Sequence, residues 1–217
     1  MLSTKILSTH DELTAAKQYQ RINFYISRKR VVLSTLQSPS LITISAVGGL
    51  FISFLLDFSI LPSFLITYIC IALYALFFIF LYYKNLINSQ LDKNNFCEFW
   101  TKPRHFIMGL FQNIDESCQL IGVLGIRPTE NSEICELMRM YVEPEFRDSG
   151  SGSQLLNAAI EEAMRQEFKI IELYTGSPMT EAINFYKKHN FKIYKLKVAL
   201  KIFPFYQIIR YYFERYI

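Results

Sequence analysis

The sequence predicts an α/β fold of the α+β kind: a mixed sheet flanked by helices, with an inserted transmembrane or re-entrant helical hairpin. Three observations support this prediction. Residues 105–191 alternate short apolar runs with amphipathic runs, as strands and helices do. Residues 41–83 form one long apolar stretch. The chain has 217 residues, which suits one ordinary domain with a modest addition.

The segment before the apolar stretch predicts a strand and a helix. We expect a short strand over Ser3–Leu7 and a helix that begins at the N-cap Asp11 and ends near Ser27. A basic cluster, Arg28–Arg30, and a polar patch, Ser34–Ser40, follow. The expected helix has apolar residues at Leu13, Ala16, Tyr19, Ile22 and Phe24. No signal peptide is expected, because the apolar run begins too deep in the chain.

The apolar stretch Leu41–Tyr83 contains a single charged residue, Asp57. Its length is roughly twice the 20 residues or so that one membrane span requires. We therefore expect a hairpin with arms from Leu41 to about Leu56 and from about Phe64 to Tyr83. The first arm is short, so a re-entrant wedge is the alternative to a full crossing. A buried helix pair would need more surrounding protein than this chain supplies. The expected turn contains the helix breakers Asp57, Ser59, Pro62 and Ser63.

Basic residues flank the hairpin, since Arg28–Arg30 precede it and Lys84 and Lys93 follow it, whereas its turn has none. By the positive-inside rule both ends face the cytoplasm. We expect an integral membrane protein with three parts. Residues 1–40 hold the first strand, the first helix and the basic segment, residues 41–83 contact the lipid bilayer, and residues 84–217 form the main domain.

After the hairpin the pattern alternates between strands and helices. Asp92–Trp100 is helical or irregular. The expected elements are strands His105–Phe111 and Gln119–Ile126 joined by the polar turn Asn113–Ser117, a central strand Cys135–Val142, a strand Ile170–Tyr174, a helix Thr180–His189, and two closing strands in Lys192–Ile217 with Pro204 between them.

Composition excludes several functions. The net charge is +4 without a long basic stripe, so we expect no nucleic-acid partner. The three histidines lie far apart, so we expect no metal site. The four cysteines, Cys70, Cys97, Cys118 and Cys135, show no C-x-x-C spacing and are expected to be reduced.

The central strand leads into a glycine-bearing turn, Arg147–Gly152, and then into an amphipathic helical run. A strand, a glycine turn and a helix in this order direct unpaired N–H groups and a positive dipole end at a phosphate. The glycines allow close approach of the backbone. A helix-opening turn that binds nothing is the alternative for the glycine pair alone.

Two motifs carry a family resemblance. The run V-E-P-E-F-R-D-S-G-S-G, Val142–Gly152, resembles the acetyl-CoA loop Q/R-x-x-G-x-G/A of the GNAT superfamily of N-acetyltransferases. Ala182–Phe191 resembles the superfamily's A-x-x-x-Y-x-x-x-G-F helix, with Asn190 in place of the glycine. Asparagine tolerates the left-handed position at a helix end. The resemblance covers about Asn95 to Phe191.

The inserted hairpin makes the architecture similar to the camello-like group of membrane-bound N-acetyltransferases. That group includes the cysteine S-conjugate enzyme and the N-acetylaspartate synthase. The resemblance implies a GNAT-like sheet, acetyl-CoA as co-substrate, no metal cofactor and, in a eukaryote, an endoplasmic reticulum location.

The resemblance also assigns site residues. Backbone N–H groups of the loop would hold the pyrophosphate, and the backbone of the central strand would pair with the pantetheine arm. One strand N–H would polarise the acetyl carbonyl. The loop residues are Arg147, Asp148, Ser149, Gly150, Ser151, Gly152 and Ser153, and the strand residues are Met140, Tyr141 and Val142.

Two residues are candidates for proton transfer. Glu136 is the expected base, on one strand face with Met138, Met140 and Val142. Its alternative is a glutamate that faces solvent or forms a salt bridge. Tyr186 matches the family tyrosine that protonates the departing thiolate, and ring packing is its alternative. Arg139, on the opposite face, is expected to be structural. The aromatic tail, Phe203–Phe213, lines the substrate mouth or lies against the bilayer.

These observations predict a membrane-anchored, acetyl-CoA-dependent N-acetyltransferase that acetylates the amine of a small amino acid, with a cysteine S-conjugate first. A protein lysine acetyltransferase at a membrane and a catalytically silent CoA-binding membrane protein are the alternatives. No Lys/Arg cluster is evident on the strands that line the cleft, which argues against a dicarboxylate such as aspartate.

Overall fold

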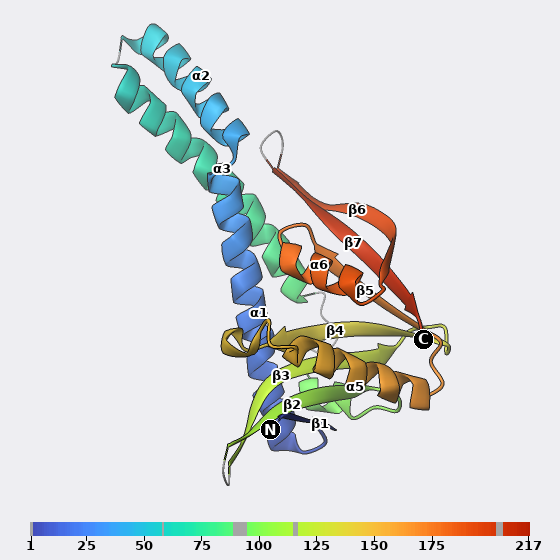
Figure 1. Cartoon of the computed structure of the whole chain (residues 1–217). Coiled ribbons are helices and arrows are strands. Elements are labelled where there is room, and N and C mark those ends of the chain that lie inside the picture. The colour runs from blue at the N-terminus through green and yellow to red at the C-terminus, as the bar shows by residue number, and fades with distance from the viewer. Residues whose placement is uncertain (1, 58, 89–94, 115–116, 203–205) are drawn as a thin grey trace.

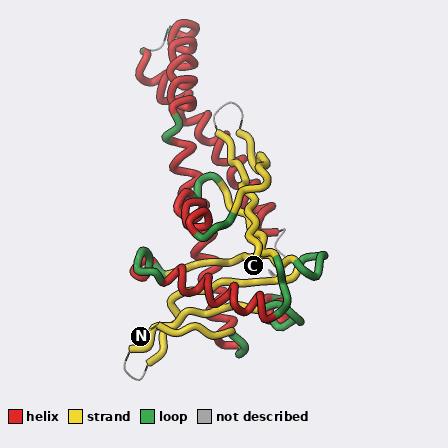
Figure 2. The backbone as a smooth tube through the Cα atoms, turned by 45° about the vertical axis from the view of Figure 1, so that its right-hand side comes forward, coloured by secondary structure: helices red, strands yellow, loops and turns green. Residues whose placement is uncertain are grey.

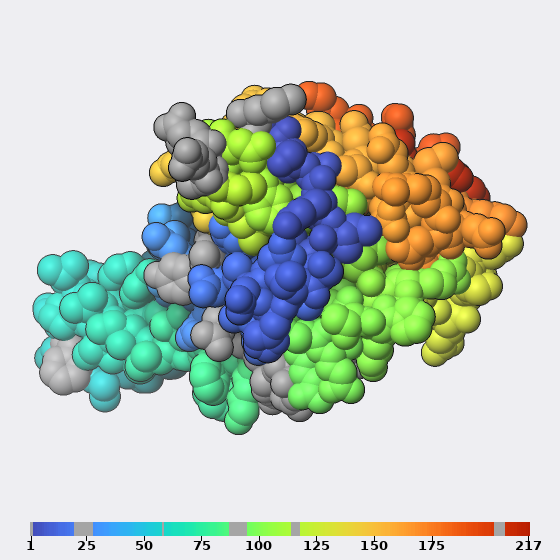
Figure 3. All heavy atoms as spheres, turned by 90° about the horizontal axis from the view of Figure 1, so that it is seen from below, coloured from blue at the N-terminus to red at the C-terminus, as the bar shows by residue number. Residues whose placement is uncertain are grey.

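The computed structural model describes residues 2–57, 59–88, 95–114, 117–202 and 206–217, without the side chains of residues 20–27, 87–88, 114, 117, 202 and 206. Within that part of the chain, seven strands form one sheet: β1 Leu2–Ile6, β2 Phe106–Ile114, β3 Ser117–Pro128, β4 Ile134–Val142, β5 Ile170–Gly176, β6 Lys192–Ile202 and β7 Tyr206–Tyr216. Their order in the sheet is β1-β2-β3-β4-β5-β7-β6. Helices lie on both of its faces, and two helices extend far beyond it (Figure 1). Figure 3 shows the same two helices, in cyan and teal, projecting to one side of the molecule.

The sheet pairs in antiparallel fashion everywhere except between β4 and β5. These two strands are parallel and pair only over Ile134–Glu136 and Ile170–Glu172. Beyond Glu136 they diverge, so the sheet opens at this seam (Figure 1).

Each face of the sheet has its own buried cluster. Helices α5, Ser151–Arg165, and α6, Thr180–Lys188, cover one face, where Leu155 and Leu156 of α5 pack with Leu124 and Leu137 of the sheet. On the other face, helices α1, His10–Leu36, and α4, Phe96–Trp100, pack onto the sheet. Full burial of one such leucine contributes about 1.5–3 kcal/mol. The second cluster includes Leu13, Ala16, Trp100, Ile107, Val123 and Tyr141.

Helix α1 spans His10–Leu36 and differs from its prediction at both ends. The N-cap is Thr9, not Asp11, because Thr9 and Glu12 form a reciprocal capping box with bonds of 3.3 and 3.2 Å. The helix also continues past Ser27, since no glycine or proline interrupts it before Pro39.

The hairpin consists of α2, Pro39–Leu56, and α3, Ile60–Asn88, and its turn is left-handed at Asp57, with φ 55°. Pro62 and Ser63 were expected in this turn, but they lie in the first turn of α3. Proline is tolerated there because its missing N–H would have no partner within the helix.

The two hairpin helices approach each other through small residues. A Cβ atom at Gly49 would lie 2.6 Å from the Cα of Phe64, so the backbones touch at this point. The hydroxyl of Thr67 donates to the Ser45 carbonyl at 2.8 Å. Such small-residue contacts are typical of helices that pack closely in a membrane.

Helix α3 continues from the hairpin into the body of the protein (Figure 2). There its residues Ala75, Ile79 and Tyr83 pack with Val31 of α1 and Ile208 of β7. The hairpin is therefore joined to the sheet by packing as well as by the chain.

Several sequence predictions lie outside the described residues. They concern Asp92–Asn94, including Lys93, then Asp115 and Glu116 of the predicted polar turn, and Phe203–Phe205, including Pro204. The side chains of Ile22 and Phe24 are also outside the described part. Asn113 of the same predicted turn pairs with Cys118 and belongs to the sheet.

Candidate active site

Strand β4 has a bulge just beyond the point where it stops pairing with β5. Arg139 has φ 64°, and the register between β3 and β4 shifts there, from Met138 opposite Gly125 to Tyr141 opposite Val123. An extra residue in one strand reverses the side-chain alternation beyond it. The expectation that Glu136 shares a face with Met140 and Val142 is therefore wrong.

The clusters on the two faces confirm this reversal. Met138 packs into the cluster beside α1, whereas Met140 and Val142 pack into the cluster beside α5 and α6. Glu136, two residues before Met138 and ahead of the bulge, is on the face of α1.

The turn after β4 is held by its own side chains. The Arg147 guanidinium donates to the Val142 carbonyl at 2.9 Å and lies 5.4 Å from the ring centre of Tyr141. The Ser149 hydroxyl donates to the Phe146 carbonyl at 2.8 Å and lies 2.9 Å from the Ser151 hydroxyl. These contacts fix the path of the loop before α5 begins.

The start of α5 is an open cradle of backbone donors. Gly150 has φ 87° and no side-chain cap, and the first bond into the helix runs from the Gln154 N–H to the Gly150 carbonyl, at 3.0 Å. The N–H groups of residues 151–153 therefore have no acceptor within the helix. A Cβ atom at Gly150 would meet no atom within 4 Å. This space and the helix dipole suit a phosphate group.

Helix α6 brings Tyr186 to the opening. The buried Tyr186 hydroxyl donates to the sulfur of Met140, at 3.7 Å, while Phe191 and Phe213 pack around its ring. Burial raises the pKa of Tyr186, so its hydroxyl stays protonated and able to donate.

The end of α6 confirms the prediction for Asn190, which has φ 63°. The Phe191 N–H donates to the Tyr186 carbonyl at 3.0 Å, which closes the helix as a left-handed cap does. Next to it, His189 lies 2.9 Å from the Ser153 hydroxyl and 2.8 Å from the Phe185 carbonyl. No motif in the sequence marks this contact between α6 and the first turn of α5.

Glu136 forms an ion pair with Arg127, its register partner on β3. The Arg127 Nε atom lies 2.8 Å from a carboxylate oxygen, and the Glu136 side chain is 14% exposed. This ion pair matches the alternative interpretation of Glu136, a glutamate in a salt bridge. Its role as a base remains a prediction.

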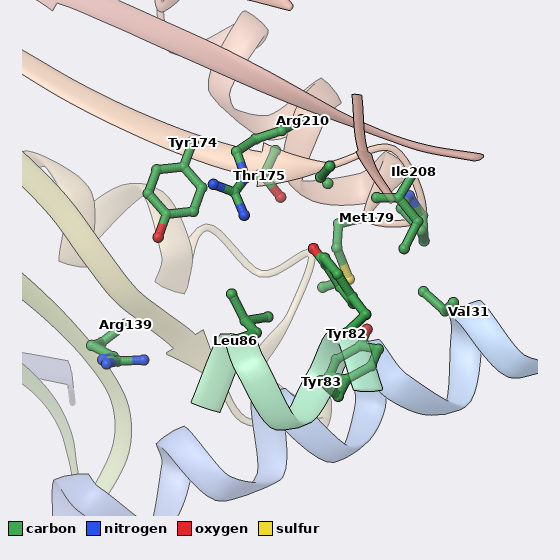
Figure 4. Close-up of a pocket in the computed structure, with 13 residues that line it drawn as sticks. Val31, Tyr82, Tyr83, Leu86, Arg139, Tyr174, Thr175, Met179, Ile208 and Arg210 are labelled. Atoms are coloured by element: carbon green, nitrogen blue, oxygen red, sulfur yellow. The ribbon is translucent and has the colours of Figure 1, made fainter. Parts of the chain in front are cut away.

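A cavity of about 200 Å³ lies beside the opening (Figure 4). Strand β4 contributes Arg139, β5 contributes Tyr174, and β7 contributes Arg210. The wall toward the hairpin comes from Tyr82, Tyr83 and Leu86 of α3 and from Val31 of α1.

Charged groups surround Tyr174 in this cavity. The Arg210 guanidinium lies 4.6 Å from the ring centre of Tyr174. Burial and the charge of Glu136 raise the pKa of Tyr174, while Arg210, Arg139 and Arg127 oppose that shift. The expectation that the cleft has no cluster of Lys or Arg is therefore wrong, because Arg139 and Arg210 both belong to the wall of this cavity.

The two halves of the site lie on opposite faces of the sheet. The open cradle of α5 and the Tyr186 hydroxyl are on the face of α5 and α6, whereas the cavity adjoins α1 and α3. Between them, β4 and β5 are no longer paired beyond Glu136 and Glu172. This arrangement suits a reaction between a phosphate-bearing ligand and a second small molecule. Among the described residues, no group of three or more His, Cys, Asp or Glu side chains could hold a metal ion.

Known proteins share this architecture. The model of the acetyltransferase (GNAT) family matches residues 72–191, which is more than half of the chain. An uncharacterized N-acetyltransferase of Methanocaldococcus jannaschii is 32% identical over 111 residues, which cover 51% of this chain and 44% of that protein. The chain thus spans less than half of that relative's length. A frog protein named "Probable N-acetyltransferase 14", from Xenopus tropicalis, is 24% identical over 84% of this chain and 83% of its own length.

A solved structure shares the fold. It is an acetyltransferase of Bacillus anthracis, assigned to streptothricin and crystallised in complex with acetyl coenzyme A. The TM-score is 0.51 at 21% identity, over 60% of this chain and 71% of the other.

Proposed function

Because the chain belongs to the acetyltransferase (GNAT) family, we propose that it is a membrane-anchored, acetyl-CoA-dependent N-acetyltransferase. Its acceptor is the amine of a small amino acid, and a cysteine S-conjugate is the first candidate. The observation that carries this proposal is the pairing of an open phosphate cradle at Gly150 with a separate cavity, one on each face of the opened sheet.

The residues of the cradle fit acetyl-CoA. The N–H groups of residues 151–153 would hold its diphosphate, and the space beside Gly150 would admit it. The backbone of Met140–Val142 would pair with the pantetheine arm, since β4 is no longer paired with β5 there. When bound, acetyl-CoA supplies the acetyl group as a thioester.

Two side chains would move the protons. The Tyr186 hydroxyl, now directed at the sulfur of Met140, would donate its proton to the departing thiolate. Glu136, on the face of the cavity, would accept the proton of the acceptor ammonium. Its partner Arg127 would keep the carboxylate in place.

The cavity wall suits an acceptor with an apolar group. Tyr82, Tyr83 and Leu86 from α3 face Tyr174 and Ile208 across it. Burial of a benzyl-sized group contributes about 2 kcal/mol, which corresponds to roughly thirtyfold in specificity. We expect S-benzyl-cysteine to be acetylated with higher kcat/KM than a lysine peptide.

The hairpin supports the membrane anchor. The apolar windows of α2 and α3 are only 17% and 11% buried, and large side chains such as Phe54, Leu61 and Phe77 are exposed. The 18 residues of α2 extend about 27 Å, close to the ~30 Å hydrocarbon core of a bilayer. This length favours a full crossing over a re-entrant wedge. The basic residues Arg28–Arg30 and Lys84 favour a cytoplasmic main domain, on the endoplasmic reticulum in a eukaryote.

Acetyl-CoA binding tests the activity first. A thermal-shift series should show that acetyl-CoA raises the Tm of the full chain in nanodiscs, and the same protein should acetylate S-benzyl-cysteine. Absence of both effects would contradict the proposed function, whereas binding without acetylation of any amine would indicate a silent CoA-binding protein.

Glycosylation mapping tests the topology. A spacer with an N-glycosylation acceptor site, inserted between Asp57 and Ser59, should be modified in microsomes if the hairpin crosses the membrane. The same spacer placed after Ile217 should remain unmodified. If neither spacer is modified, the hairpin is re-entrant. If only the C-terminal spacer is modified, the main domain faces the lumen and the proposed orientation is wrong.

A further inference from the structure

The cavity has a strongly uneven charge. Its described wall contains two arginines, Arg139 and Arg210, and no aspartate or glutamate. The nearby Glu136 is already paired with Arg127. A cavity whose charged wall residues are both cations favours an anionic ligand. We propose that Arg139 and Arg210 bind the carboxylate of the acceptor, which restricts the acceptor class to amines that carry a carboxylate. This proposal rests on the proposed function.

The backbone places Arg139 in the cavity at a cost. Its φ of 64° is unusual for a residue other than glycine, asparagine or aspartate, and such strain costs about 1 kcal/mol or more. A regular strand would continue the alternation that directs Leu137 into the core beside α5. The bulge instead makes Arg139 part of the cavity wall at the seam where β4 leaves β5 (Figure 4).

Arg210 reaches the same cavity from another strand. It is opposite Gly176 in the pairing of β5 with β7, and both residues belong to the cavity wall. Figure 4 shows Arg210 extending toward Tyr174 and α3, with Arg139 on the other side of the Tyr174 hydroxyl. The Arg210 guanidinium lies 4.6 Å from the centre of the Tyr174 ring and also interacts with the side chains of Tyr82 and Tyr212, which orient it. Because arginine has five N–H donors, it can also contact a carboxylate.

Guanidinium groups recognise carboxylates in particular. The planar donors of arginine match the two carboxylate oxygens, and such charge-assisted pairs are stronger than neutral hydrogen bonds. The tyrosines and Leu86 would then contact the remainder of the acceptor, and its amine would face the opening beside Glu136. A peptide lysine has no free carboxylate and could not form these charge-assisted hydrogen bonds.

Matched pairs of amines test the proposal in the wild-type full chain. Each pair differs only by the carboxylate: S-benzyl-cysteine and S-benzyl-cysteamine, phenylalanine and phenethylamine, lysine and cadaverine. In each pair that the enzyme acetylates, we expect the amine with the carboxylate to have a kcat/KM at least about thirtyfold higher than the amine without it, which corresponds to ~2 kcal/mol. The rates are compared at a pH at which the fraction of neutral amine is matched.

Variants then assign the preference to the arginines. In Arg139→Gln and in Arg210→Gln, the preference should fall to a few-fold, mainly through KM, while the affinity for acetyl-CoA stays within twofold. Arg210→Lys should retain part of it. The matched control is Lys197→Gln, which removes the same charge from the exposed register partner of Arg210 on β6, outside the cavity wall. It should keep the full preference.

The outcomes separate this inference from the proposed function. Equal kcat/KM within the pairs, or acetylation of the carboxylate-free amines alone, would overturn the inference and leave an N-acetyltransferase. A preference that survives in both glutamine variants would overturn the role of the arginines. A wild-type chain that neither binds acetyl-CoA nor acetylates any amine would overturn both. The wild-type comparison decides the acceptor class even if a variant does not fold.

Discussion

Replacement of Tyr186 by phenylalanine separates catalysis from packing. The change removes only the hydroxyl, and the contact that is lost is a 3.7 Å hydrogen bond to the sulfur of Met140. Sulfur is a weak acceptor, so the loss of stability should stay below about 1 kcal/mol. General acid catalysis typically contributes about 10²–10⁴ in rate. We therefore expect Tyr186→Phe to lower kcat at least a hundredfold, with a nearly unchanged Tm.

The assay combines steady-state kinetics, calorimetric affinity for acetyl-CoA and thermal unfolding of the full chain. The affinity should stay within twofold of wild type, because the hydroxyl acts only when the thiolate departs. The pKa of Tyr186 is raised by burial, so the wild-type rate should not fall near pH 10 through loss of this proton.

Tyr19→Phe is the matched control for this experiment. The Tyr19 hydroxyl donates to the Leu120 carbonyl at 2.6 Å, on the α1 face of the sheet. Its removal should lower stability by about 1 kcal/mol and leave kcat close to wild type. If Tyr186→Phe instead loses stability and acetyl-CoA affinity in step with kcat, or keeps the wild-type kcat, Tyr186 is a packing residue and the proposed proton transfer is wrong.

Three further predictions test the loop, the first helix and the hairpin. Gly150→Val should abolish acetyl-CoA binding while the chain stays folded, because a branched side chain would fill the open cradle and is disfavoured at a φ of 87°. An unchanged calorimetric affinity for acetyl-CoA would show that the loop is not the binding site. The hydrogen bond from Lys5 is the main reason that the pKa of Glu12 is lowered to about 2. The ionised Glu12 therefore stabilises the folded chain above about pH 4.5, and this contribution to the free energy of unfolding is lost as the pH falls toward 2. Glu12→Gln should therefore lower the Tm at pH 7, and a difference from wild type that does not narrow below pH 4.5 would refute this assignment. Gly49→Ala should separate α2 from α3, since its Cβ would lie 2.6 Å from the Cα atom of Phe64, whereas the Cβ of the control Gly48→Ala would lie 3.4 Å from the Thr67 side chain. Cross-linking between α2 and α3 should fall only in Gly49→Ala, and equal yields in the two variants would contradict the packing.

The sequence predicts the parts of the site that depend on local geometry. A glycine turn before a helix and the left-handed Asn190 are set by a few neighbouring residues, so the motifs around Gly150 and Tyr186 could be placed without a structure. The order of strands and helices follows from hydrophobic periodicity for the same reason. The break in the hairpin near Asp57 is also local.

The cavity could not be predicted in this way. The bulge at Arg139 depends on how β4 pairs with β3, and no glycine or proline in β4 marks it. Arg210 enters the cavity because β7 pairs with β5 in one particular register, with Arg210 opposite Gly176. A shift of one residue would move its side chain to the other face. Such pairings between distant strands leave no pattern in a single sequence.

The composition of the cavity wall has a practical consequence for soluble fragments. Division at residues 40 and 84 looks natural in the sequence, but α3 runs through the second boundary, and Tyr82 and Tyr83 belong to the wall. A fragment that starts at Lys84 would lack these tyrosines and all of α1, and would expose the sheet face that Leu13 and Ala16 cover. A fragment that retains the cavity must therefore keep α1 and the part of α3 from about Ala75 onward. Only the distal end of the hairpin is dispensable for the cavity wall.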